Sequence, residues 1–233
     1  DNNWVTEGEK SKEFVNQLNK ITGSKYGVLA PNGTLSLYLG LKALGVGRGD
    51  EVIVPNFSFY ASASAVIMAG AKPVFAEVDI ENLQADVNQI IKKISRRTKA
   101  IMPVHVYGMS CDIEEIMKIA HKYKLKVIED AAQGIGLKFK GKHVGSFGEI
   151  GSFSFFADKT ITTGEGGYLC TNSQEIYNKL LYLRNQGRIN RGSFIHPELG
   201  YNFRMNDIQS SMGLAQLKKL ELIIKTKKEN FEL

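Results

Sequence analysis

One lysine in this sequence stands where its amine could do covalent chemistry. Lys159 follows an apolar, aromatic stretch at 152–157 and precedes a run of hydroxyl and glycine residues that ends at Gly167. We expect this setting to hold the amine in a partly dry pocket, and dehydration favours the neutral amine that attacks a carbonyl carbon. A surface hairpin lysine with no chemical role is the alternative.

An acid ends a second apolar run. Residues 127–130 read Val-Ile-Glu-Asp and lead into a turn of small residues. If the run is a strand, Glu129 and Asp130 face opposite ways, so only one of them can point into a site. An aspartate there could bind a metal, orient a base or pair with a protonated heterocycle. A helix N-cap remains equally open at this point.

A third loop, Ala-Pro-Asn-Gly-Thr at 30–34, connects a predicted strand to a predicted helix. Gly33 would let the backbone approach an anion, Thr34 offers a hydroxyl, and the start of the helix supplies free N–H groups. These are the parts of a phosphate cradle. The spacing matches neither the Walker motif nor GxGxxG, and an ordinary capped helix would also explain it.

The elements that must position these loops follow a simple order. Apolar runs of strand length alternate with segments of helical period, which predicts an α/β fold of three layers, α/β/α, with a mostly parallel sheet. In such sheets the loops at the carboxyl edge bind ligands. Predicted strands cover 26–30, 51–54, 73–76, 100–103, 126–129, 151–156 and 167–171, and predicted helices cover 14–21, 35–44, 62–69, 87–94, 113–123, 173–186 and a long stretch from about 206 onward.

Composition excludes several classes of protein. Hydrophobic residues make up 43% and charged residues 23%, as in folded globular proteins, and the net charge is only +6. The basic clusters lack interleaved aromatic residues, so we expect no nucleic-acid partner. The four histidines show no metal-site spacing, and no apolar stretch is long enough to span a membrane, so we expect a cytoplasmic protein without a metal site.

A phosphate cradle, an acid and an imine-forming lysine are together what a pyridoxal 5′-phosphate (PLP) site needs. Long motifs support this interpretation, among them PNGTLSLYLGLKALGVGRGDEVIVPNFSFYASASAV, PVHVYG, VIEDAAQGIG, SFSFFADKTITTGEGGYL and GYNFRMNDIQSSMGLAQL. In these motifs and their order the chain resembles the DegT/DnrJ/EryC1/StrS sugar aminotransferases, which are fold-type I PLP enzymes. It is most similar to the members that aminate GDP-4-keto-6-deoxymannose to give GDP-perosamine.

The resemblance implies roles for individual residues. Lys159 matches the lysine that forms a Schiff base with PLP and later moves the substrate proton. Asp130 matches the acid that keeps the pyridine nitrogen protonated, and Gln133 the residue beside the phenolic oxygen. Phe59 matches the aromatic residue that stacks on the ring, with Tyr60 as an open alternative. The matching phosphate contacts are Gly33, Thr34, Ser154 and, from the other subunit of a homodimer with shared sites, Asn202.

The implied reaction moves an amino group from an amino acid, usually glutamate in this family, to a 4-keto nucleotide sugar. A PLP-dependent sugar dehydratase of the same fold is a rival, but its members carry histidine at the position of Lys159. A non-catalytic dimeric remnant is a second rival. A dinucleotide-binding domain is disfavoured because GxGxxG is absent. We expect 1–205 to be the PLP-binding large domain and 206–233 to begin a helix leading to a small C-terminal domain that is missing here.

Overall fold

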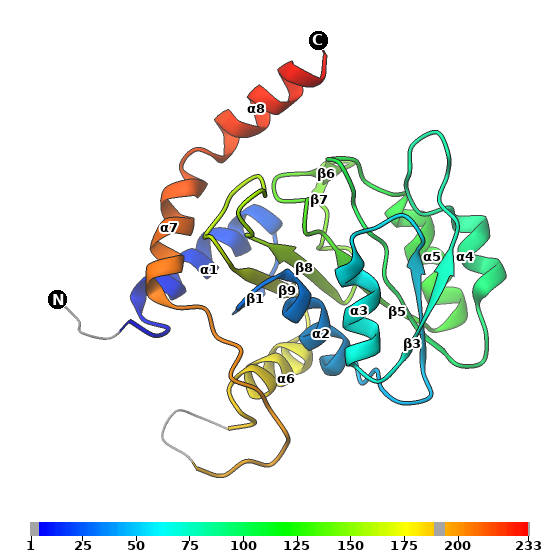
Figure 1. The fold of residues 1–233 in the computed structure, drawn as a ribbon, viewed down its shortest axis with the longest axis horizontal. Coiled ribbons are helices and arrows are strands. Elements are labelled where there is room, and N and C mark those ends of the chain that lie inside the picture. The colour runs from blue at the N-terminus through cyan, green and yellow to red at the C-terminus, as the bar shows by residue number, and fades with distance from the viewer. Residues whose placement is uncertain (1–4, 189–193, 233) are drawn as a thin grey trace.

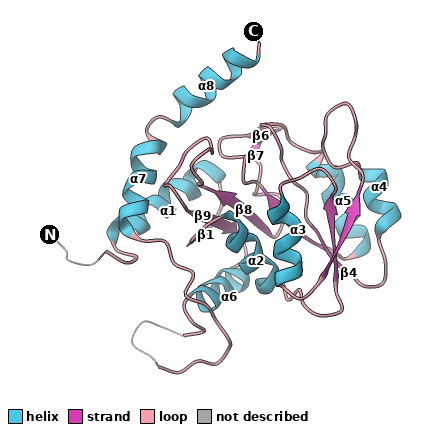
Figure 2. Cartoon of the chain, in the orientation of Figure 1, coloured by secondary structure: helices cyan, strands magenta, loops and turns pink. Residues whose placement is uncertain are grey.

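A single sheet of seven strands runs through the computed structural model, which describes residues 5–188 and 194–232 (Figures 1 and 2). The strand order is β1-β9-β8-β5-β4-β2-β3, and all neighbours from β8 to β3 pair in parallel. Only β9 runs opposite to its neighbours β1 and β8. The prediction of a mostly parallel sheet is therefore confirmed. The strands are β1 (Tyr26–Ala30), β2 (Glu51–Pro55), β3 (Lys72–Ala76), β4 (Thr98–Ile101), β5 (Lys126–Asp130), β8 (Ile150–Ser154) and β9 (Gly167–Thr171).

Helices cover both faces of this sheet, as the three-layer prediction requires. Figure 1 shows α2, α3 and α6 grouped on one side, and residues of these three helices share one buried cluster. Residues of α4 and α5 form a cluster on the opposite face, and α1 contributes to a third. The helices are α1 (Glu9–Thr22), α2 (Gly33–Ala43), α3 (Tyr60–Met68), α4 (Val87–Lys93), α5 (Ile113–Tyr123), α6 (Gln174–Arg184), α7 (Asp207–Leu217) and α8 (Leu220–Phe231).

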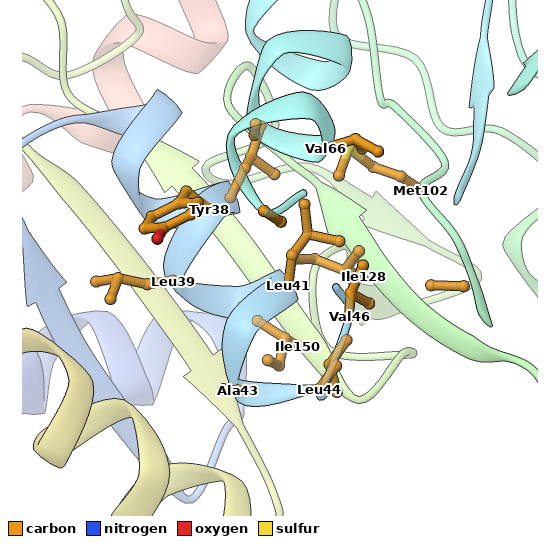
Figure 3. Close-up of a cluster of buried hydrophobic side chains, with 14 of the residues drawn as sticks. Tyr38, Leu39, Leu41, Ala43, Leu44, Val46, Val66, Met102, Ile128 and Ile150 are labelled. Atoms are coloured by element: carbon orange, nitrogen blue, oxygen red, sulfur yellow. The ribbon is translucent and has the colours of Figure 1, made fainter. Parts of the chain in front are cut away.

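The two-sided burial of the strands explains their apolar runs. Ile53 and Val127 pack with residues of α4 and α5, whereas their neighbours Val54 and Ile128 pack with residues of α2 and α3. Successive strand residues therefore enter opposite layers. Figure 3 shows side chains of α2 packed beside Ile128 and Ile150 of the sheet. Each fully buried leucine or isoleucine contributes about 1.5–3 kcal/mol relative to exposure, so this packing fixes the strand ends that carry the site.

Local signals start the helices where the sequence places them. Asn32 precedes α2, and its side chain accepts a hydrogen bond from the N–H of Leu35 at 2.9 Å. Asp112 caps α5 in the same way through the N–H of Glu115. Such caps satisfy N–H groups that have no partner within the helix. The cap from Asn32 also fixes the first turn of α2 at the edge of the sheet.

The end of the chain differs from the prediction of one long helix from about Asn206. Asn206 does start a helix, with a reciprocal capping box to Gln209, but α7 ends at Leu217 and α8 begins only at Leu220. The two helices meet at an angle in Figure 1. A short hairpin of β6 (Lys138–Phe139) and β7 (Lys142–His143) was also not predicted, because two-residue strands leave no periodic pattern.

Two expectations from the sequence can be compared only with the residues that the structure describes. Part of the segment that connects the last two predicted helices, residues 189–193, lies outside the described residues. Within 5–188 and 194–232, no helix combines the length and the apolar character needed to cross a membrane.

Candidate active site

Asp130 lies at the carboxyl end of β5, in the middle of the sheet, and only 4% of it is exposed. Its Oδ2 accepts a hydrogen bond from Ser62 Oγ of α3 at 2.7 Å. Its Oδ1 accepts one from the N–H of Ala132 at 3.1 Å. These two donors fix the carboxylate at the sheet edge. No helix begins directly after Asp130, because the next element along the chain is the short strand β6. The interpretation of Asp130 as a helix N-cap is therefore wrong.

The negative charge of an ionised Asp130 is only partly compensated by the groups around it. Burial raises the pKa of its carboxyl group, and the bonds from Ser62 and Ala132 and the positive charges of His105 and Lys159 only partly oppose that rise. Among the described residues, no cation comes within ion-pair distance of Asp130. A buried carboxylate of this kind is completed by a cationic partner such as a protonated ring nitrogen.

Glu129 faces the other side of β5, as strand alternation predicted. Its side chain is fully buried and accepts hydrogen bonds from the N–H groups of Gly145, Phe147 and Gly148 at 2.6–2.7 Å. Its Oε2 also lies 3.1 Å from Nε2 of the buried His105. Burial acts to lower the pKa of His105, but Cys111 and Glu129 raise it to about 10. Glu129 is therefore a structural anchor, which leaves Asp130 as the acid at the site.

This anchor gives a stability prediction. Glu129→Gln keeps the shape but removes the charge opposite His105, so we expect the free energy of unfolding in urea to fall by about 3–5 kcal/mol near neutral pH. The imidazole's contribution is fully present below pH about 6.5, the unfolded pKa, and is lost as the pH rises through about 10. The deficit of the variant should therefore shrink in alkaline solution. Glu114→Gln, which removes an exposed partner of Lys140, should change little. An equally small effect of Glu129→Gln would refute the anchoring role.

Lys159 lies in the turn after β8, where its N–H donates to the carbonyl of Phe156. Its side chain is only 18% exposed, and Asp158 Oδ1 lies 3.6 Å from its Nζ. Its charge also acts on Asp130, which places the two side chains within electrostatic reach of each other. The structure thus brings together the two groups on which the chemical prediction depends. A freely solvated hairpin lysine does not fit this burial.

The residues predicted to form a phosphate cradle lie where α2 meets β8. A Cβ atom built on Gly33 would lie 2.8 Å from Cβ and 3.0 Å from Oγ of Ser154, so only glycine permits this approach. The amides of Gly33 and Thr34 open the helix and have no carbonyl four residues back within it. N–H groups at a helix start beside a serine hydroxyl suit an anionic oxygen.

Gln133 and Lys159 line a common cavity of about 760 Å³. The Oε1 atom of Gln133 accepts a hydrogen bond from the N–H of Tyr107 at 2.7 Å, which orients the amide. Tyr107 has a positive φ of 54° and also lines the cavity. A polar amide beside the lysine is therefore available to a ligand's oxygen.

The two aromatic candidates are both free to receive a ligand ring. Phe59 immediately precedes α3 and Tyr60 begins it, and they are 75% and 74% exposed. The same helix carries Ser62, which binds Asp130. Both rings thus start from the element that touches the acid, and the choice of Phe59 over Tyr60 stays a prediction.

Asn202 stands apart from the other predicted residues. It is exposed, forms a backbone bridge with Asn185, and its Oδ1 accepts a hydrogen bond from Arg204 Nε at 2.9 Å. No contact of the described residues joins it to Gly33 or Ser154. A phosphate contact from Asn202 to its own chain's cradle has no support in this structure, and the predicted contact to a partner's cradle stays a prediction.

Sequence reasoning missed Ser62 and the role of the Tyr107 amide. Ser62 Oγ donates a hydrogen bond to Oδ2 of Asp130 and lies 2.6 Å from Oγ of Ser58. Ser58 precedes α3 and Ser62 lies in its first turn, so no helical spacing in the sequence indicated this contact. The backbone N–H of Tyr107 could not be found from the sequence either, because every residue except proline carries such a donor.

Comparisons with known proteins agree with this geometry. The model of the DegT/DnrJ/EryC1/StrS aminotransferase family matches residues 1–233. "GDP-perosamine synthase" of Escherichia coli O157:H7 is 44% identical over 230 residues, which are 98% of this chain and 63% of that protein. The protein of the same name from Vibrio cholerae is 41% identical, covering 100% of this chain and 64% of its own length. The chain therefore spans less than two thirds of these relatives.

A solved structure is similar throughout the described fold. The crystal structure of S. venezuelae DesV in complex with a ketimine intermediate has a TM-score of 0.90 and 32% identity to this chain, over 94% of this chain and 59% of that one. The three-layer fold and the lysine and acid at its sheet edge define the class of PLP-dependent aminotransferases. Within that class, this chain belongs to the DegT/DnrJ/EryC1/StrS aminotransferase family, which confirms the resemblance found in its motifs.

Proposed function

We propose that this chain carries the PLP site of a sugar aminotransferase that transfers an amino group from glutamate to a 4-keto nucleotide sugar, GDP-4-keto-6-deoxymannose. The observation that carries the proposal is the pairing of Lys159 with the buried, incompletely neutralised Asp130 in one site. The names of the two GDP-perosamine synthases among the relatives support the sugar and the nucleotide. In the net reaction, the amino group and one hydrogen of glutamate exchange places with the keto oxygen of the sugar.

The residues fit PLP at each of its functional groups. Gly33, Thr34 and Ser154 would hold the phosphate, and Asp130 would face the ring nitrogen. Gln133 would contact the phenolic oxygen, beside Lys159 in the same cavity. When bound, PLP supplies a ring that accepts the electron pair released as a C–H bond next to the nitrogen breaks.

The chain's own residues perform the remaining tasks. Asp130 keeps a proton on the ring nitrogen, because an ionised carboxylate in a buried setting gains most from a cation beside it. The Nζ of Lys159 would take the proton from the substrate carbon that bears the nitrogen and would return it to the carbon on the other side of that nitrogen. Phe59 fixes the ring plane from the residue just before α3, and the limited exposure of Lys159 restricts water at the reacting atoms.

Two features of assembly belong to the same proposal. Asn202 is exposed and separate from its own chain's cradle, which suits a contact to the phosphate in a partner of a homodimer. We also assign 1–205 to the PLP-binding domain and 206–233 to the start of a connection to a small C-terminal domain. The greater length of the relatives supports this division.

Half-reaction spectra test the proposal directly. The protein loaded with PLP should absorb visible light, and added glutamate should convert it to the pyridoxamine form. GDP-4-keto-6-deoxymannose should then restore the first spectrum and yield the amino sugar, detected by mass spectrometry. An unchanged spectrum with glutamate, together with loss of water from the sugar, would favour the dehydratase. A colourless protein that ignores added PLP would favour the non-catalytic remnant.

A further inference from the structure

Helix α8 forms one wall of the cavity that contains Lys159. Besides the loop residues around Lys159, the cavity is lined by Ile224, Lys227, Lys228 and Phe231 of this helix. Their spacing of three, four and seven residues places them on one face of the helix. The residue Ile224 also packs against the 135–137 segment beside Gln133, since its Cδ1 lies 2.2 Å from where a Cβ on Gly136 would stand. The side chains of α8 therefore face any substrate that reaches the lysine.

The charge on this wall is mostly positive. Besides Lys159, the cavity is lined by Lys138, Lys227 and Lys228, which we call the lysine rim, against the acids Asp158 and Glu232. Among the described residues, no carboxylate forms an ion pair with a rim lysine. Two nearby lysines that do not line the cavity have partners. Next to the rim, Lys140 pairs with Glu114, and Lys225 pairs with Glu229.

One rim lysine already touches the catalytic loop. The Nζ of Lys227 donates a hydrogen bond to Oγ1 of Thr160 at 3.2 Å, and Thr160 directly follows Lys159. The ammonium group therefore sits over the turn that carries the reactive amine. An anion bound by Lys227 would lie in the cavity that Lys159 lines, beside the turn that carries the reactive amine.

We propose that the lysine rim binds the diphosphate of the nucleotide sugar and thereby directs the keto carbon toward Lys159. A diphosphate spreads its charge over several oxygens, which suits three separate ammonium groups. The cavity of about 760 Å³ is larger than an amino acid requires and has the size of sites for larger organic ligands. The inference rests on the proposed function, because it names the group of that substrate which the rim recognises.

The test uses the PLP-loaded holoenzyme and GDP as the probe. Lys227→Gln and Lys138→Gln should each weaken GDP binding about tenfold, because each removes a charge-assisted hydrogen bond. Calorimetry gives the Kd values, and raising the salt concentration should reduce the difference. Lys225→Gln is the matched control, since Lys225 belongs to the same helix but does not line the cavity and pairs with Glu229, so the Kd should stay unchanged.

The glutamate half-reaction separates this inference from the proposed function. Its rate should fall far less than the GDP affinity in both rim variants, because glutamate carries no diphosphate, and it should stay unchanged in Lys225→Gln. Equal GDP affinity in wild type and rim variants, or no GDP binding at all, would overturn the rim assignment while a normal glutamate response upheld the aminotransferase. A slower glutamate half-reaction with unchanged GDP affinity would instead assign the rim to the amino-acid carboxylate. Failure of the wild type to respond to glutamate would count against the aminotransferase itself.

Discussion

Replacing Lys159 with alanine is expected to abolish amino transfer, lowering its rate by at least about four orders of magnitude. The substitution removes both the nucleophile and the group that moves the proton, and proton transfer alone contributes about 10²–10⁴-fold. The visible absorbance of the PLP-loaded protein should disappear. Borohydride should fix the cofactor to Lys159 in the wild type, as peptide mapping would show, and to no residue in the variant.

A second variant separates charge from nucleophilicity at this position. Lys159→Arg keeps a cation near Asp130 but supplies no amine that forms an imine. We therefore expect it to fold like the wild type, with unchanged thermal unfolding, and to remain as inactive as Lys159→Ala. Borohydride labelling of another lysine, with activity retained in Lys159→Ala, would show that the reactive amine lies elsewhere.

Asp130→Asn should lower the rate of the glutamate half-reaction about 10²–10³-fold while leaving the lysine able to bind PLP. An amide cannot hold a proton on the ring nitrogen, so charge developing on the substrate carbon loses its electrostatic stabilisation. Stopped-flow spectra of the PLP-loaded variant would measure the rate. Undiminished turnover would mean that another group faces the ring nitrogen.

The same variant should stabilise the protein without PLP. The pKa of Asp130 is raised on folding by burial, so the folded state holds its proton more tightly than the unfolded state. Stability therefore falls as the pH rises from the unfolded pKa of about 3.9 through the raised value. Asp130→Asn removes this loss, and its advantage in urea unfolding should be larger at pH 8 than at pH 4. Added PLP should reverse the order, because it supplies the cation that Asp130 lacks. An advantage that does not change with pH would contradict the assigned cause.

Much of the fold could be predicted because its signals are local. The buried strands carry unbroken apolar runs, and caps such as Asn32 mark where a helix starts. The break between α7 and α8 could not be predicted, because Lys218 and Lys219 include neither proline nor glycine. Packing of Leu220 and Ile224 into the core decides where α8 begins. That contact joins parts of the chain that are distant in sequence.

The candidate site divides in the same way. Residue type and loop position indicated Lys159, Asp130 and Gly33, since each belongs to a strand-helix junction or to the turn after a strand. Their partners could not be inferred, because Ser62 and the rim lysine Lys227 meet the site only through tertiary packing. The resemblance supplied roles for single residues, but no sequence pattern indicated that α8 would form a cavity wall.

Two adjacent carboxylates on β5 carry different duties, and the lateral alignment of that one strand assigns them. Glu129 pairs opposite Gly151, and Asp130 opposite Ser152. A slip of one residue would exchange the two faces, leaving Asp130 among the amides of 145–148 and the longer Glu129 at the catalytic edge. Such a slip would break the hydrogen bonds that the backbone N–H groups of Gly145, Phe147 and Gly148 donate to Glu129, and would thus destabilise the fold. A molecule with this strand out of register would therefore unfold, and would not accumulate as a folded but inactive protein.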